Sequence, residues 1–111
     1  MFEKLKKRRK MNLERDIVMA LMQVYDPEIP VNIYDLGLIY EIKVSEELDV
    51  DITMTLTAPN CPMADSLLMQ VKEAIEMTPG VRNANIHLTF EPAWDKSRMS
   101  EEALYELGLD E

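Results

Sequence analysis

The stretch "LDVDITMTLTAPNCP", Leu48 to Pro62, decides the fold. Apolar and polar residues alternate without a break over residues 48–57, and the pattern then stops at two prolines and the only cysteine of the chain. A period of two indicates a strand with one buried face, because successive side chains of a strand point to opposite sides. We therefore expect a strand here whose core-facing residues are Leu48, Val50, Ile52, Met54 and Leu56.

Two more alternating runs flank this strand. Residues 38–44 place Leu38, Tyr40, Ile42 and Val44 on one face, and the short connection 45–47 favours an antiparallel hairpin with the strand that follows. Residues 81–90 form the third run, with Ala84, Ile86, Leu88 and Phe90 expected inside. A helical crossover between the second and third strands favours a parallel pair.

Helical spacing appears in three places. The first segment starts at Asn12 as its N-cap and is expected to end near Tyr25, because Pro27 disfavours helical geometry just before it. Its Met-rich part, residues 18–22, is interpreted as core. The second helix follows Pro62 and ends before Gly80, and Ser100 caps a short third helix that Gly108 closes.

The element order α-β-β-α-β-α predicts an α+β fold. We expect a two-layer single domain over residues 12–111, with a small mixed three-stranded sheet and helices on one face. Residues 1–11 are predicted to be a flexible basic leader.

Charge is distributed unevenly around a net value of −9. Six of the twelve Lys and Arg residues fall within residues 1–10, whereas the rest of the chain carries six bases and twenty acids. This acidic body argues against nucleic acid as a partner, because phosphate-backbone binding relies on many cationic contacts. No apolar run is long enough for a membrane span, and the leader lacks the apolar segment of a signal peptide. A single cysteine without an export signal predicts a cytoplasmic protein.

Cys61 has several interpretations that the residues themselves leave open. It lies at an expected helix start, where free N–H groups and the helix dipole lower the pKa of a thiol and favour the reactive thiolate. It is equally a small apolar residue that packs, as free cysteines often do. A thiol enzyme would need a base, and His87 oriented by Asp35 is the one candidate; a solvated strand histidine is the simpler interpretation. One thiolate cannot complete a metal site, so a cluster held through Cys61 needs a second subunit, a client or a small thiol.

Four segments, "DPEIP", "IYDLGLIY", "LTAPNCP" and "EPAW", resemble the family of iron–sulfur assembly proteins. This family includes the bacterial SufT and PaaD proteins and the eukaryotic cytosolic iron–sulfur targeting factor of the MIP-eighteen type. The resemblance runs from about Leu13 to Trp94. It implies a small α+β domain that helps to mature iron–sulfur proteins.

The resemblance also assigns residues. Cys61 would be the functional thiol and a tentative metal or cluster ligand, with no catalytic residue. The residues that would shape its site are Asp35, Thr57, Pro59 and Pro62. Those that support the family motifs are Asp26, Pro27, Glu28, Gly37 and Trp94.

The expected function is a non-catalytic accessory role in iron–sulfur cluster assembly or delivery. Its partners would be the assembly machinery and client apoproteins, and a homodimer is left open because it would bring two thiols together. A transient iron–sulfur cluster or iron is the expected cofactor, with none bound permanently. The alternatives are a protein–protein interaction module, a cysteine-dependent enzyme and a PaaD-like role in oxygenase maturation; the last is disfavoured because the cysteine-rich C-terminal segment of PaaD-type members is missing.

Overall fold

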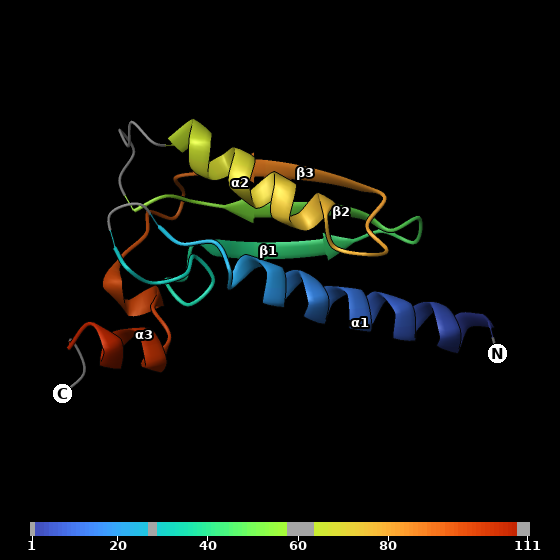
Figure 1. The fold of residues 1–111 in the computed structure, drawn as a ribbon, viewed down its shortest axis with the longest axis horizontal. Helices are drawn as coiled ribbons and strands as arrows, with labels where there is room; N and C mark the ends of the chain where they lie inside the picture. Colours follow the sequence, from blue (N-terminus) through green and yellow to red (C-terminus); the bar gives the residue numbers. More distant parts are fainter. Residues whose placement is uncertain (1, 27–28, 58–63, 109–111) are drawn as a thin grey trace.

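The computed structural model describes residues 2–26, 29–57 and 64–108. Helices and strands follow one another in the predicted order (Figure 1). Their bounds are α1 (Phe2–Leu21), β1 (Ile39–Val44), β2 (Asp49–Met54), α2 (Ala64–Glu76), β3 (Asn83–Leu88), a 3-10 turn (Lys96–Arg98) and α3 (Glu101–Glu106). No helix within the described ranges is long and apolar enough to cross a membrane.

The sheet has the order β1-β2-β3, with β2 in the centre. β1 pairs with β2 in antiparallel orientation, with Ile42 opposite Ile52, and β2 pairs with β3 in parallel orientation, with Ile52 beside Ile86. The predicted mixed three-stranded sheet is therefore confirmed.

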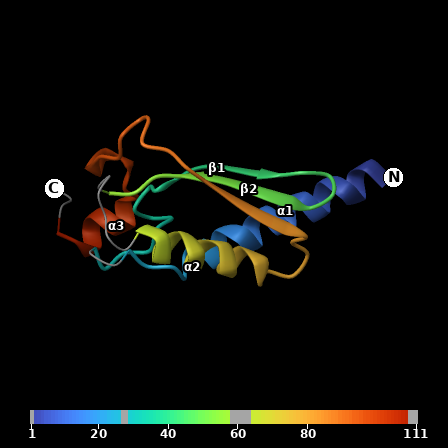
Figure 2. The same cartoon turned by 90° about the horizontal axis from the view of Figure 1, so that it is seen from above.

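The core lies between one face of the sheet and two helices. Ile17 of α1 and Val71 of α2 are fully buried with Ile52 of the central strand, and all three belong to one apolar cluster. α3 lies beyond the end of the sheet, near the point where α1 ends (Figures 1 and 2). The arrangement is thus a two-layer α+β fold with a C-terminal segment packed at one end.

α1 differs from its prediction at both ends. It begins at Phe2, not at Asn12, because Lys, Arg, Glu and Leu favour helix and no breaker separates the basic residues from the apolar ones. It ends at Leu21, where the Val24 N–H donates to the Leu21 carbonyl in a tight turn. The chain then reverses direction, and Tyr25 pairs with Asn32. The prediction that the Met-rich part packs in the core holds only for some of its residues. Leu21 is buried, whereas the side chain of Met19 is 59% exposed.

A bulge in β1 changes which residue faces the core. Ile39 lies opposite Met54 and Glu41 lies opposite Thr53, so Tyr40 is the extra residue between them. Residues directly opposite each other in an antiparallel pair share a face, so Ile39 takes the core-facing position that was expected for Tyr40. The alternation resumes after the bulge with Ile42 and Val44, as predicted.

The end of β3 is less buried than expected. Leu88 and Phe90 were assigned to the core, but their side chains are 40% and 38% exposed. β3 is an edge strand, so these residues have a strand neighbour on one side only. Two apolar side chains therefore reach the surface where β3 ends.

Candidate functional site

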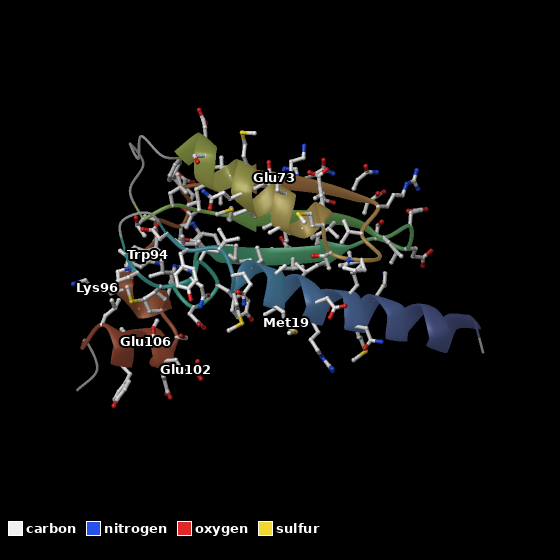
Figure 3. The ribbon with its side chains drawn as sticks, viewed as in Figure 1. Met19, Glu73, Trp94, Lys96, Glu102 and Glu106 are labelled. Atoms are coloured by element: carbon white, nitrogen blue, oxygen red, sulfur yellow. The ribbon has the colours of Figure 1, made fainter. Side chains whose placement is uncertain are left out.

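The segments that carry the described residues of the family motifs gather at one end of the sheet, where β1 begins and β2 and β3 end (Figure 1). Figure 3 shows Trp94 at this end. The motif residues come from four separate segments of the chain: Asp26, Asp35 with Gly37, Thr57, and Trp94. Five of the assigned residues lie outside the described residues: Pro27, Glu28, Pro59, Cys61 and Pro62. Their assignments stay predictions.

Asp35 is held by its own turn. The side chain of Asn32 donates from Nδ2 to Asp35 Oδ2 at 2.8 Å, and its Oδ1 accepts from the Asp35 N–H, also at 2.8 Å. The carbonyl of Asp35 accepts from the N–H of Ser100 at 2.8 Å. Asp35 thus fixes the turn before β1 and ties it to the start of α3.

Gly37 is the position where the C-terminal segment approaches most closely. Its φ is +80°, and a Cβ built there would lie 2.1 Å from the carbonyl oxygen of Arg98. Beside it, Trp94 Nε1 donates to the carbonyl of Leu36 at 2.6 Å. Only a residue without a side chain fits this crossing, which explains the glycine of the motif. Trp94 is partly buried against the core and anchors its edge.

Asp26 is buried and orders the loop that follows α1. Its Oδ2 accepts from the N–H of Ile29 at 2.8 Å, and its own N–H donates to the Val31 carbonyl. An aspartate that bonds to a backbone N–H three residues on stabilises a turn locally. The described part of the first motif therefore has a structural role at this end of the sheet.

Thr55 is a residue whose importance the alternation pattern concealed. It was placed on the outer polar face, but its side chain is 0% exposed and Oγ1 has no hydrogen-bond partner among the described residues. Its backbone is well paired, since its N–H donates to the Leu38 carbonyl at 2.8 Å. A buried hydroxyl without a partner costs stability, so Thr55 lowers the stability of this end of the sheet.

Thr55→Val is expected to raise the free energy of unfolding by about 1 kcal/mol, because it removes an unpaired buried hydroxyl at nearly constant shape. Thermal unfolding measures the change. Thr55→Ser is the matched control: it keeps the hydroxyl, loses a buried methyl group and should be less stable than the wild type. A lower melting temperature for the valine variant would show that the hydroxyl is paired in solution.

His87 does not meet Asp35. Its Nε2 lies 3.1 Å from Asp51 Oδ1 on the exposed side of the sheet, whereas the Asp35 carboxylate bonds to Asn32. The suggestion that Asp35 orients His87 as a base is therefore wrong. Within the described ranges, no group of three or more His, Cys, Asp or Glu side chains is placed to hold a metal ion.

A pocket of about 400 Å³ lies beside Gly37. Ile39, Tyr40, Pro92 and Arg98 complete its lining. The Tyr40 hydroxyl donates to the Pro92 carbonyl at 2.7 Å, and the guanidinium of Arg98 lies 4.6 Å from the centre of the Tyr40 ring. The bulge at Tyr40 turns this side chain toward the C-terminal segment, and neither Tyr40 nor Arg98 was identified from the sequence.

Asp95 caps the 3-10 turn beside this pocket. Hydrogen bonds from the Ser97 hydroxyl and the Ser97 N–H hold the pKa of the Asp95 carboxyl below its usual value. These bonds favour the charged form, which is the form that accepts both of them. The cap fixes the turn that carries Arg98.

Comparison with known proteins shows which family this chain resembles. Residues 14–88 match the family described as iron–sulfur cluster assembly protein. A relative from Porphyromonas gingivalis, named an Fe-S protein maturation auxiliary factor, is 57% identical over 86% of this chain and 91% of its own length. The Fe-S protein maturation auxiliary factor SufT of Staphylococcus aureus is 35% identical over 78% of this chain and 98% of its own.

A solved structure shows the same fold. The crystal structure of a domain of unknown function from Bacillus anthracis superposes with a TM-score of 0.84 at 35% identity. It covers 90% of this chain and 95% of its own. The resemblance predicted from the four sequence segments is confirmed by these matches.

Proposed function

Because this chain belongs to the family of iron–sulfur cluster assembly proteins, we propose that it is a non-catalytic accessory factor for assembling clusters or delivering them to client proteins. The names of its relatives as maturation factors support a role in this process. The proposed cargo is a transient iron–sulfur cluster or iron. The proposed place of action is the cytoplasm, where reducing conditions keep a lone cysteine as a thiol.

The observation that carries the proposal is the convergence of the described motif residues at the end of the sheet where the chain enters the segment 58–63. Thr57 lies between the end of β2 and this segment, and α2 begins just after the segment at Ala64. The turn of Asp35 and Gly37 lies at the same end and is fixed by the Trp94 and Ser100 hydrogen bonds. Because these hydrogen bonds join segments that are far apart in the sequence, they give this end of the sheet a rigid framework on which a functional site can be built.

We assign to Cys61 the thiolate that contacts the cargo. Thiolates are the preferred protein ligands of iron–sulfur clusters, and one chain has a single cysteine to give. The remaining ligands would come from the client, from an assembly partner or from a small thiol. An incomplete ligand set suits a factor that passes its cargo on, because transfer only has to break one protein–cluster bond.

The exposed apolar side chains at this end support docking of a protein. Leu88 and Phe90 reach the surface where β3 ends, and Tyr34 is exposed in the turn before β1. Apolar side chains that surround a functional group are typical of surfaces that bind other proteins. We propose that client apoproteins bind at this end of the sheet.

The proposal is tested in cells that lack the gene. The activity of an iron–sulfur-dependent dehydratase should fall while the amount of its polypeptide stays unchanged, and the wild-type gene should restore it. An enzyme of the same cells that needs no cluster is the control. Unchanged dehydratase activity under iron limitation and oxidative stress would contradict a role in maturation.

A further inference from the structure

Arg98 is the one charged side chain among the described residues that line the pocket beside Gly37. Its guanidinium lies over the Tyr40 ring, 4.6 Å from the ring centre. Within the described residues, this guanidinium makes no ion pair and donates no hydrogen bond. An arginine side chain carries five N–H donors in a planar fork, so these donors remain available to a ligand in the pocket.

The backbone of Arg98 is fixed by contacts on both sides of it in the sequence. Its N–H donates to the Asp95 carbonyl at 3.1 Å within the 3-10 turn. Its carbonyl oxygen lies close to Gly37, at a place where a side chain would not fit. Two residues further on, the Ser100 N–H donates to the Asp35 carbonyl at 2.8 Å. These contacts tie the turn that carries Arg98 to the turn before β1.

The side chain of Arg98 is also held in place. The Tyr40 ring on which it packs is fixed at its far end, because the Tyr40 hydroxyl donates to the Pro92 carbonyl at 2.7 Å. Binding by a flexible arginine loses rotamer freedom, whereas an arginine that is already ordered loses less. The fold therefore presents the guanidinium in one position before a ligand arrives.

The charge at the pocket differs from that of the rest of the chain. Outside residues 1–10 the chain carries six bases and twenty acids. Two of these six bases, Lys96 and Arg98, belong to the 3-10 turn, and Figure 3 shows Lys96 at the same end of the molecule as Trp94. Asp95, which caps this turn, accepts two hydrogen bonds within it. The acids of α3 line a separate hollow that shares no described residue with this pocket. The pocket therefore favours an anion although the chain as a whole is acidic.

The size and the lining of the pocket suit a small organic molecule. Its volume of about 400 Å³ lies within the range of small-molecule sites, roughly 300–1,000 Å³. Ile39, Pro92 and the Tyr40 ring supply apolar surface around the cation of Arg98. Small-molecule sites typically combine apolar walls with a few polar groups that fix the orientation of the ligand.

We propose that this pocket binds a small organic acid, with the carboxylate on Arg98 and an apolar body against Ile39 and Pro92. A carboxylate matches the guanidinium because both groups are planar and two parallel N–H···O bonds join them. A phosphate dianion fits less well, because the described lining offers one cation and the rest of the chain is acidic. The inference goes beyond the proposed function, since it holds whether or not Cys61 carries cargo.

Two kinds of organic acid share this chemistry, those with a thiol and those without. The difference matters because the pocket lies near the point where the chain enters the segment 58–63. Ile39 of the lining lies opposite Met54, and Thr57 follows Met54 by three residues, at most about 10 Å of extended chain. A carboxylate-bearing thiol held on Arg98 would therefore bring a second sulfur to this end of the sheet.

NMR titration of the full chain with three matched compounds under reducing conditions tests the proposal, with the Arg98 backbone and Nε–H signals as the readout. N-acetylcysteine and N-acetylalanine both carry the carboxylate and should bind with a Kd on the order of 1 mM or tighter. N-acetylcysteine amide keeps the thiol but lacks the carboxylate, so it should bind at least about tenfold more weakly. Either ranking of the two acids supports the proposal: equal affinities assign the site to thiol-free acids as well, and tighter binding of N-acetylcysteine assigns it to thiols.

Variants of the arginine separate recognition from stability. Arg98→Gln should weaken the binding of both acids at least about tenfold, and Arg98→Lys should weaken it several-fold, because lysine keeps the charge but lacks the planar fork. Arg82→Gln is the matched control. It removes one positive charge at the other end of β3, where the Arg82 N–H donates to the Leu48 carbonyl, and should leave both affinities unchanged.

Four results would overturn the proposal. They are Arg98 signals that do not shift with either acid at about 10 mM, equal binding of the amide and the acids, tighter binding of inorganic phosphate than of the acids, and an affinity that Arg98→Gln and Arg98→Lys leave unchanged. Melting temperatures of the variants serve as the control for folding.

Discussion

Cys61→Ser is expected to reduce client maturation to the level of cells that lack the gene. A serine hydroxyl stays protonated at neutral pH and is a poor ligand for iron–sulfur clusters, whereas a thiolate binds them well. The measurement is the dehydratase activity of deletion cells that express the variant. Equal melting temperatures and equal amounts of wild-type and variant protein serve as the control for folding.

Anaerobic reconstitution with iron and sulfide separates two ways in which Cys61 could act. If the thiolate binds the cargo, the serine variant should hold much less iron and sulfide than the wild type. Equal cluster content with lost maturation would remove direct ligation and leave a chaperone that binds clients through Cys61. A pull-down of client apoproteins with both proteins then measures that role.

Full maturation activity of Cys61→Ser would contradict the assignment itself. Cys61 would then be a packing residue, and the interaction-module interpretation would take its place. Slow alkylation of the native thiol, compared with the unfolded protein, would agree with that outcome.

Gly37→Ala is expected to lower the free energy of unfolding by about 3 kcal/mol and the melting temperature by about 10 °C or more. The added Cβ would meet the backbone oxygen of Arg98 at 2.1 Å, and a φ of +80° is unfavourable for alanine. Backbone cannot move aside as a flexible side chain can, so the C-terminal segment would have to leave the turn before β1. Thermal unfolding by circular dichroism measures the loss.

Gly108→Ala is the control for the cost of placing alanine at a positive φ. Its φ is +71°, but no atom of the described residues lies within 4 Å of the added Cβ, so the cost should be about 1 kcal/mol. The difference between the two variants isolates the contact with Arg98. Equal destabilisation by both substitutions would show that the Arg98 backbone does not approach Gly37 as closely in solution as it does in the structure.

The strands followed from the alternation in residues 48–57 and in the two neighbouring runs, and their orientations followed from the connections between them. This worked because one face of each strand is buried, which imposes a period of two on the sequence. Helix ends were less predictable. The extension of α1 to Phe2 depends on the absence of a breaker rather than on a positive signal, and its end at Leu21 depends on the pairing of Tyr25 with Asn32.

The candidate site was predicted as a set of residues but not as an arrangement. The family motifs identified Asp26, Asp35, Gly37, Thr57 and Trp94, and the fold brings the segments that carry them to one end of the sheet. The packing of Arg98 on Tyr40 was not predictable, because it depends on a bulge in β1 and on a segment far along the chain. The buried hydroxyl of Thr55 was missed for a similar reason, since a polar residue in an alternating strand is expected outside.

The sequence by itself determined the α+β class, the mixed three-stranded sheet and the family, because the hydrophobic period, the lengths of the connections and the local motifs depend on residues that are near each other in the chain. Only the tertiary structure decided that Gly37 must accommodate Arg98, that the Thr55 side chain is buried, and that Arg98 packs on the ring of Tyr40. Contacts between distant segments set these features. No local pattern encodes them, since burial of a side chain depends on what the rest of the chain places over it.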